Sequence, residues 1–171
     1  MAPSESVQQH RAAATAALSV GVITVSDSRT IETDTGGAAI VELVVGAGHV
    51  VKSRTIVTDD RDRIISAVLA MAGDPDIDAI ITTGGTGIAR RDVTYDAISS
   101  ILSRELTGFG ELFRMLSWEE IGPAAMLSRT TAGAIGTTAI FALPGSRNAI
   151  CLAMERLILP EIEHVVFEIR K

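Results

Sequence analysis

Short apolar runs alternate with helix-like segments along the whole chain, and this alternation constrains the fold more than any other feature. The runs at 18–25 (LSVGVITV), 77–83 (IDAIITT) and 137–143 (TTAIFAL) are typical of buried strands, and the more polar run at 49–57 predicts another strand. A strand that is apolar on both faces belongs in the middle of a parallel sheet. The pattern therefore predicts an α/β fold with a mostly parallel sheet and helices on both of its faces.

The segments between and after these strands have helical periodicity or helix-ending residues. We expect helices over the ranges 38–48, 59–73, 95–106 (beginning near Thr94), 108–122, 149–159 and 161–171. The stretch 124–136 is rich in loop-forming residues, and we expect no regular element there.

One apolar group stands out within the segment 108–122. It consists of Phe109, Leu112, Phe113, Leu116 and Trp118. Core packing is the favoured interpretation, and a subunit interface is the alternative.

Length and composition limit the class of protein. A chain of 171 residues favours one domain, which we place at 17–171 after a flexible tail at 1–16. The tail has no apolar signal-peptide region, no run is long enough to span a membrane, and Cys151 is the single cysteine, so we expect a cytoplasmic protein. The formal charge of −6 argues against a general nucleic-acid partner.

Polar or glycine-rich loops follow all four predicted strands. Ligands of parallel sheets bind beyond the carboxyl ends of the strands, and these loops should share that edge. The topology therefore brings together residues that are far apart in the sequence, namely Ser26, Asp27, Asp59, Asp92 and Ser146.

The loop after the third strand reads TTGGTGIARRDVTYD, and its glycines run from Gly84 to Gly87. Glycines at such a turn let backbone amides approach phosphate oxygens. The loop matches neither the P-loop nor the dinucleotide fingerprint, so anion binding and a plain tight turn both remain open. Arg90 and Arg91 either neutralise phosphate charge, form a solvated surface pair, or serve as a partner for Asp92.

Three acidic residues at this edge have two possible roles each. Asp59 and Asp60 sit at the start of a predicted helix, Asp92 precedes another, and each could cap its helix, although Thr94 is the better capping residue beside Asp92. Carboxylates beside a phosphate loop could instead hold Mg²⁺, which prefers oxygen ligands.

Five stretches taken together resemble the MoaB/Mog family of molybdenum cofactor biosynthesis proteins. They are GVITVSDSR, IITTGGTGIARRDVTYDAI, GFGELFRMLSWEEIG, AMLSRTTAG and ALPGSRNAICLAME. The resemblance runs from about residue 18 to the C-terminus, and the third stretch looks more like the MoaB branch than the MogA branch.

The resemblance implies a fold, an activity and an assembly. The fold is a three-layer α/β/α sandwich of the molybdopterin-binding type, in a homo-oligomer that is a trimer or, in the MoaB branch, a hexamer. Active members are molybdopterin adenylyltransferases: they transfer AMP from MgATP to the terminal phosphate of molybdopterin and release pyrophosphate. The implied partners are ATP and a pterin phosphate, with Mg²⁺ as cofactor.

The family's two critical aspartates match Asp59 and Asp92, which would be catalytic and would hold Mg²⁺. The resemblance and the loop positions together give the candidate binding residues Ser26, Asp27, Thr83, Gly84, Gly85, Thr86, Gly87, Ser117, Ser128, Pro144, Gly145 and Ser146.

The last loop departs from the family pattern. It reads PGSRN from Pro144, where adenylyltransferases of the family often have PGNP or PGQP. We therefore keep a second hypothesis, a molybdopterin-binding or assembly protein with little or no adenylyl transfer. A nucleotide-amide hydrolase on a related domain is a weaker third one.

Overall fold

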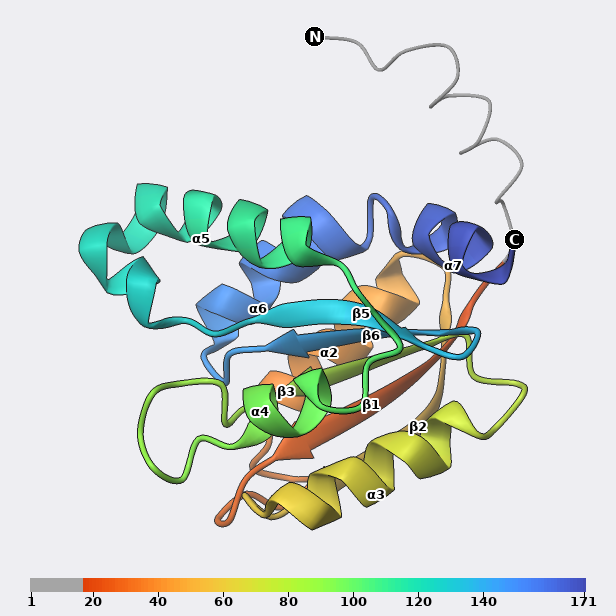
Figure 1. Cartoon of the computed structure of the whole chain (residues 1–171), viewed down its shortest axis with the longest axis horizontal. Coiled ribbons are helices and arrows are strands. Elements are labelled where there is room, and N and C mark those ends of the chain that lie inside the picture. Colours follow the sequence, from red (N-terminus) through yellow and green to blue (C-terminus); the bar gives the residue numbers. More distant parts are fainter. Residues whose placement is uncertain (1–16) are drawn as a thin grey trace, which may run out of the picture.

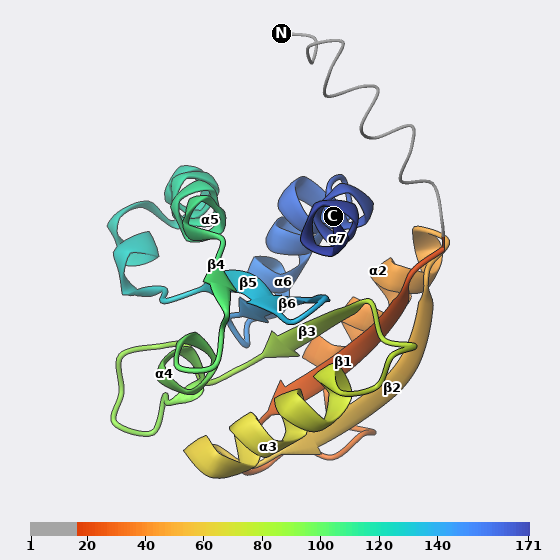
Figure 2. The ribbon, with the colours of Figure 1, turned by 45° about the vertical axis from the view of Figure 1, so that its right-hand side comes forward.

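The computed structural model describes residues 17–171, so the predicted tail at 1–16 lies outside the described residues. Its centre is a six-stranded sheet in the order β2-β1-β3-β6-β5-β4 (Figures 1 and 2). The strands are β1 (Ser19–Val25), β2 (Val50–Val57), β3 (Ala79–Thr83), β4 (Arg104–Glu105), β5 (Thr131–Ile135) and β6 (Thr138–Leu143). The first four in spatial order are parallel, and β5 and β4 are added in antiparallel pairs, which confirms the mostly parallel sheet.

Helices cover both faces of the sheet, as Figure 1 shows. One face packs against α2 (Thr35–Gly46), α5 (Thr107–Ile121), α6 (Arg147–Ala153) and α7 (Ile162–Arg170). The other face packs against α3 (Arg61–Ala72) and α4 (Thr94–Ser99). A 3₁₀ helix, η1 (Gly122–Leu127), follows α5, and a π-helical turn, η2 (Met154–Ile158), follows α6. The three-layer α/β/α sandwich is therefore confirmed.

The central strands alternate between the two layers of core. Ile81 of β3 packs into the cluster under α2, α5, α6 and α7, whereas its neighbour Ile80 packs into the cluster under α3 and α4. Both side chains are fully buried. This double burial is the reason for the near-continuous apolar runs in the sequence.

Two expectations along the chain are wrong. The helix predicted at 95–106 ends at Ser99, because Ser103 then donates its backbone N–H to Ala134 and the chain pairs with β5 as the short strand β4. The stretch 124–136 contains the last part of η1 and all of the strand β5, which turns into β6 at Gly136 with a φ of +57°. The small residues of β5 gave little periodic signal, and its pairing with β6 decides its conformation.

Core packing is confirmed for three of the five residues in the apolar group of α5. Phe109, Phe113 and Leu116 are buried in the core, while Leu112 and Trp118 are about half exposed. Among residues 17–171, none of the helices combines the length and the apolar character needed to cross a membrane.

Candidate functional site

The glycine loop after β3 is held in a backbone conformation that requires glycine. Gly84 and Gly85 have φ angles of +100° and +65°, in the left-handed region that side chains disfavour. A Cβ at Gly84 would collide with the carbonyl oxygen of Val25, and one at Gly85 would lie 2.8 Å from Oδ1 of Asp59. The glycines therefore let the loop pass directly over β1 and against Asp59.

The two acids after β2 have different tasks. Asp60 is the N-cap of α3 and accepts the N–H of Arg63 at 2.9 Å. Asp59 is thereby free of capping, and its own N–H donates to Oδ1 of Asp27 at 3.0 Å. The loop after β1 and the loop after β2 are thus joined by one hydrogen bond beside the glycine loop.

The environment of Asp59 disfavours its charged form. Burial is the largest cause of a raised pKa for this carboxyl, and the nearby carboxylates of Asp27 and Asp92 add to it. The Arg91 guanidinium acts in the opposite direction, which gives this exposed arginine an electrostatic role toward Asp59. A cluster of like charges of this kind is stabilised when a cation or a donor-rich ligand binds.

Asp92 closes a tight turn in the glycine loop. Its Oδ2 accepts the N–H of Ala89 at 2.8 Å, and its N–H donates to the carbonyl of Ala89 at 2.9 Å. A Cβ at Gly87 would lie 2.6 Å from the same Oδ2, so the carboxylate rests on the glycine. The expected cap by Thr94 is wrong: Val93 is the N-cap of α4, no side chain caps that helix, and the buried Thr94 hydroxyl has no partner within 17–171.

A cavity of about 320 Å³ opens between the glycine loop and α5. The candidate residues in its lining are Gly85, Thr86, Gly87, Asp92, Ser117, Ser128, Pro144, Gly145 and Ser146. Ser117 is buried at 4% exposure, and the buried Ser128 hydroxyl has no partner among the described residues. Four parts of the chain, namely the glycine loop, α5, the segment 124–128 and the loop before α6, therefore converge on one cavity that offers hydroxyls, backbone amides and a carboxylate.

A smaller cavity of about 140 Å³ adjoins the first on the β1 side. Three more candidate residues line it, Ser26, Thr83 and Gly84, whereas Asp27 lines neither cavity and accepts the N–H of Asp59. Gly145 lines both cavities, and a Cβ on it would lie 3.4 Å from the Cα of Gly84. Asp59 lies beside the partition, against Gly85, and does not line either cavity.

The smaller cavity also holds a residue that the sequence reasoning missed. Asp34 is only 3% exposed, and it accepts hydrogen bonds from Gly37 N, Thr24 Oγ1 and Arg54 Nη2 at 2.8, 2.7 and 2.9 Å. Its place before Thr35-Gly-Gly is a readable N-cap signal, but the pairing with Arg54 of β2 depends on the folded sheet. This network holds Asp34 in the lining of the smaller cavity, which Ser26 and Gly84 also line.

The unusual PGSRN loop supports α6. Ser146 is the N-cap of this helix, with its hydroxyl 3.3 Å from the N–H of Ala149. Arg147 points to Glu42 of α2, at 4.0 Å, and does not line the main cavity. Within residues 17–171, no group of three or more His, Cys, Asp or Glu side chains is placed to hold a metal ion without other ligands.

The comparisons with known proteins agree with the fold and show the family. The family model described as a probable molybdopterin binding domain matches residues 21–164. Molybdenum cofactor biosynthesis protein B of Bacillus subtilis is 52% identical over 167 residues, which cover 97% of this chain and 98% of the relative. The protein of the same name from Bacillus cereus is 48% identical over 167 residues, with coverages of 97% and 99%.

Solved structures that resemble this chain also include molybdenum and tungsten cofactor biosynthesis proteins. A crystal structure of molybdenum cofactor biosynthesis protein B matches with a TM-score of 0.89 and 49% identity, over 91% of this chain and 97% of that one. The tungsten cofactor synthesizing protein MoaB from Pyrococcus furiosus matches with a TM-score of 0.81 and 37% identity, over 91% and 98%. The chain is a molybdopterin-binding-type α/β domain, and it belongs to the MoaB/Mog family.

Proposed function

We propose that this protein acts in molybdenum cofactor biosynthesis as a molybdopterin adenylyltransferase, which transfers AMP from MgATP to the terminal phosphate of molybdopterin. The observation that carries the proposal is the main cavity, where the glycine loop, Asp92, Ser117, Ser128 and the Pro144–Ser146 loop meet in a chain of this family. The names of its relatives, molybdenum cofactor biosynthesis protein B, support the same pathway.

The two adjoining cavities suit two ligands. The main cavity of about 320 Å³ is within the size range of small-molecule sites and has buried hydroxyls for a polar ring system such as a pterin. The smaller cavity beside Ser26 and Gly84 suits part of a nucleotide. Since Gly145 lines both cavities and lies against Gly84, the reacting phosphates of both ligands would meet at the glycine loop.

The chemistry needs no nucleophile from the protein. A terminal phosphate oxygen of molybdopterin attacks the α-phosphorus of ATP; a new P–O bond forms, and the bond to the β-phosphate oxygen breaks and releases pyrophosphate. The protein's task is to align two polyanions and to stabilise the charge between them. Amides of Gly84 to Gly87 would contact phosphate oxygens.

Asp59 and Asp92 are the residues that would hold Mg²⁺. Their fit rests on their position: the Asp59 carboxylate lies against Gly85 and the Asp92 carboxylate against Gly87, in the loop whose amides would contact phosphate. Burial, with the nearby carboxylates of Asp27 and Asp92, raises the pKa of Asp59, which a bound cation would oppose. Mg²⁺ is commonly bound by one or two carboxylates together with substrate phosphates and water, so a cage made of protein side chains alone is not required. When bound, the ion neutralises phosphate charge.

The experiment measures pyrophosphate release with ATP and Mg²⁺, with and without molybdopterin. Asp92→Asn should fold normally and lose about 100-fold to 1,000-fold in rate, the usual effect of removing one charge-stabilising group. Asp62→Asn, on the exposed side of α3, is the matched control and should keep the wild-type rate. Transfer by Asp92→Asn at the wild-type rate would refute the assignment.

Binding without transfer is the second candidate function. The PGSRN loop supports it, because the Ser146 hydroxyl already caps α6 and supplies fewer hydrogen-bonding groups than an amide side chain at that place. Tight binding of molybdopterin without pyrophosphate release would favour this candidate. Pyrophosphate release without any pterin would favour the nucleotide-amide hydrolase.

The exposed apolar side chains of α5 and η1 support a homo-oligomer. Leu112, Met115, Trp118, Ile121 and Met126 are each between 48% and 75% exposed. A patch of this kind marks an association surface more often than a free one. Light scattering on the purified chain would distinguish a trimer or hexamer from a monomer.

A further inference from the structure

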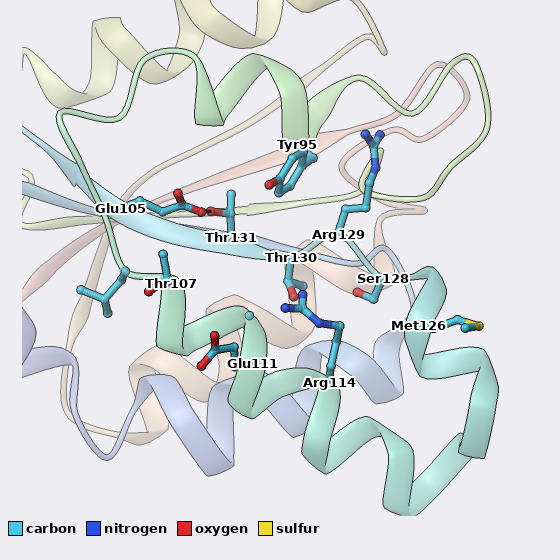
Figure 3. Close-up of a pocket in the computed structure, with 12 residues that line it drawn as sticks. Tyr95, Glu105, Thr107, Glu111, Arg114, Met126, Ser128, Arg129, Thr130 and Thr131 are labelled. Atoms are coloured by element: carbon cyan, nitrogen blue, oxygen red, sulfur yellow. Dashed lines mark hydrogen bonds between the residues drawn. The ribbon is translucent and has the colours of Figure 1, made fainter.

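Arg129 reaches from the segment between η1 and β5 to the loop that carries Asp92. Figure 3 shows its side chain on one wall of a second cavity, next to Tyr95. The guanidinium carbon lies 5.2 Å from the centre of the Tyr95 ring, a cation–π distance. The Arg129 side chain is therefore held against Tyr95 of α4, beside the loop that it also contacts.

The side chain makes three hydrogen bonds to the loop and to the start of α4. Nε donates to the carbonyl of Gly87 at 2.9 Å, Nη2 to the carbonyl of Asp92 at 2.6 Å, and Nη1 to the carboxylate of Asp96 at 3.0 Å. The backbone N–H of Arg129 adds a fourth bond, to the carbonyl of Thr86 at 3.2 Å. One residue thus holds both ends of the exposed segment 88–91.

These contacts set where the Asp92 carboxylate lies. The carboxylate rests on Gly87 and accepts the N–H of Ala89, so its position depends on the spacing between Gly87 and Asp92. Arg129 spans that spacing with one planar group. Lysine has a single ammonium group on a flexible stem and cannot reproduce the fork.

Arg129 acts through the loop and not on the ligand. It does not line the main cavity, and the contacts of all three guanidinium nitrogens are protein oxygens. Its neighbour Ser128 lines both the main cavity and the second cavity, so the segment Ser128–Arg129 lies at the wall between these two cavities.

We propose that Arg129 is a positioning residue that holds Gly87 and Asp92 in the arrangement needed for adenylyl transfer. The inference rests on the proposed function for its effect on rate, but the effect on the loop itself is independent of any activity.

The test compares Arg129→Gln and Arg129→Lys with the wild type in the full chain. Arg129→Gln should lower kcat about 100-fold, the scale expected when a catalytic group is displaced by about 1 Å, with KM for ATP nearly unchanged. Arg129→Lys should restore little of this loss. Arg114→Gln is the control: Arg114 lines the same second cavity, has no hydrogen-bond or ion-pair partner among residues 17–171, and should keep both constants.

Hydrogen exchange gives the second measurement. The amides of Ala89, Asp92 and Thr94 all donate hydrogen bonds inside the loop or back to Gly85. In Arg129→Gln their exchange should accelerate by about tenfold or more while the sheet keeps its protection.

Two results would overturn the inference. One is wild-type exchange of the loop in Arg129→Gln; the other is a raised KM with an unchanged kcat, which would assign Arg129 to ligand binding. A wild-type chain without transfer activity would refute the proposed function, and the exchange measurement would then still decide whether Arg129 positions the loop.

Discussion

Asp34 and Asp60 offer a matched pair of helix caps that differ in burial and charge pairing. Asp34 caps α2 inside the protein and pairs with Arg54 at 2.9 Å, whereas Asp60 caps α3 at the surface. Asparagine caps a helix about as well as aspartate. Asp34→Asn therefore keeps the cap and removes the charge, and Asp60→Asn makes the same chemical change where no buried cation depends on it.

The magnitude follows from the partner that is left behind. Removing one member of a buried ion pair costs about 3–5 kcal/mol, because the other charge stays buried. Arg54 is 20% exposed and keeps a 3.1 Å bond to the carbonyl of Asp34, so we expect the lower end, about 3 kcal/mol. For a domain of this size each kcal/mol moves Tm by about 2–4 °C, which gives a fall of roughly 6–12 °C.

The pH dependence of this effect has a definite sign. Burial by itself would raise the pKa of Asp34, but the bonds from Gly37, Thr24 and Arg54 outweigh it and hold the pKa below its usual value of 3.8. A carboxyl with a lowered folded-state pKa stabilises the fold above its unfolded-state pKa and loses this contribution as the pH falls through the folded-state value. The Tm gap between wild type and Asp34→Asn should be full at pH 7 and should close only below about pH 4.

Thermal and urea unfolding followed by circular dichroism measure the gap. Asp60→Asn should change the free energy of unfolding by no more than about 0.5 kcal/mol, as exposed substitutions usually do. Equal shifts for the two variants, or a gap for Asp34→Asn that stays constant down to pH 2, would refute the reasoning about the buried pair.

Three further changes test the site and the surface. Asp59→Asn should raise Tm at neutral pH. The folded-state pKa of this carboxyl is raised, so the fold becomes less stable as the pH rises through that pKa. A Tm gain that does not grow with pH would contradict this. Gly85→Ala should destabilise the fold by about 1–2 kcal/mol from the left-handed backbone alone. Gly46→Ala, in open space at the end of α2, should instead stabilise the fold by up to about 1 kcal/mol. Urea unfolding measures both changes. Trp118→Glu should shift light scattering toward the monomer if the exposed face of α5 joins subunits.

The layer structure and the edge that carries the site follow from local patterns. Apolar runs of strand length, separated by helical segments, imply parallel strands whose carboxyl ends share an edge, and this was enough to place Ser26, Asp59 and Asp92 in one region. Local patterns alone do not distinguish Asp59 from Asp60, because both residues suit a helix start; the family resemblance selects Asp59, and the cap geometry shows why it is free.

The parts of the site that the sequence did not predict are positioned by contacts between elements that are distant in the sequence. β5 has small residues and a weak pattern, so its strand conformation depends on β6 beside it. Because β5 runs antiparallel, its beginning lies at the edge where the parallel strands end, and this brings Ser128 and Arg129 to the glycine loop. The pairing of Asp34 with Arg54 is hidden from the sequence for the same reason, since it joins residues on neighbouring elements.

The glycine partition between the two cavities bears on inhibitor design. Gly145 lines both cavities, and a Cβ on it would lie 3.4 Å from the Cα of Gly84, so neither residue places a side chain at this contact. A bisubstrate compound with a linker running past these two glycines would join a group in the main cavity to one beside Ser26. Any residue with a side chain at position 145 would crowd Gly84 and weaken the binding of such a compound. The same crowding would act on the natural ligands.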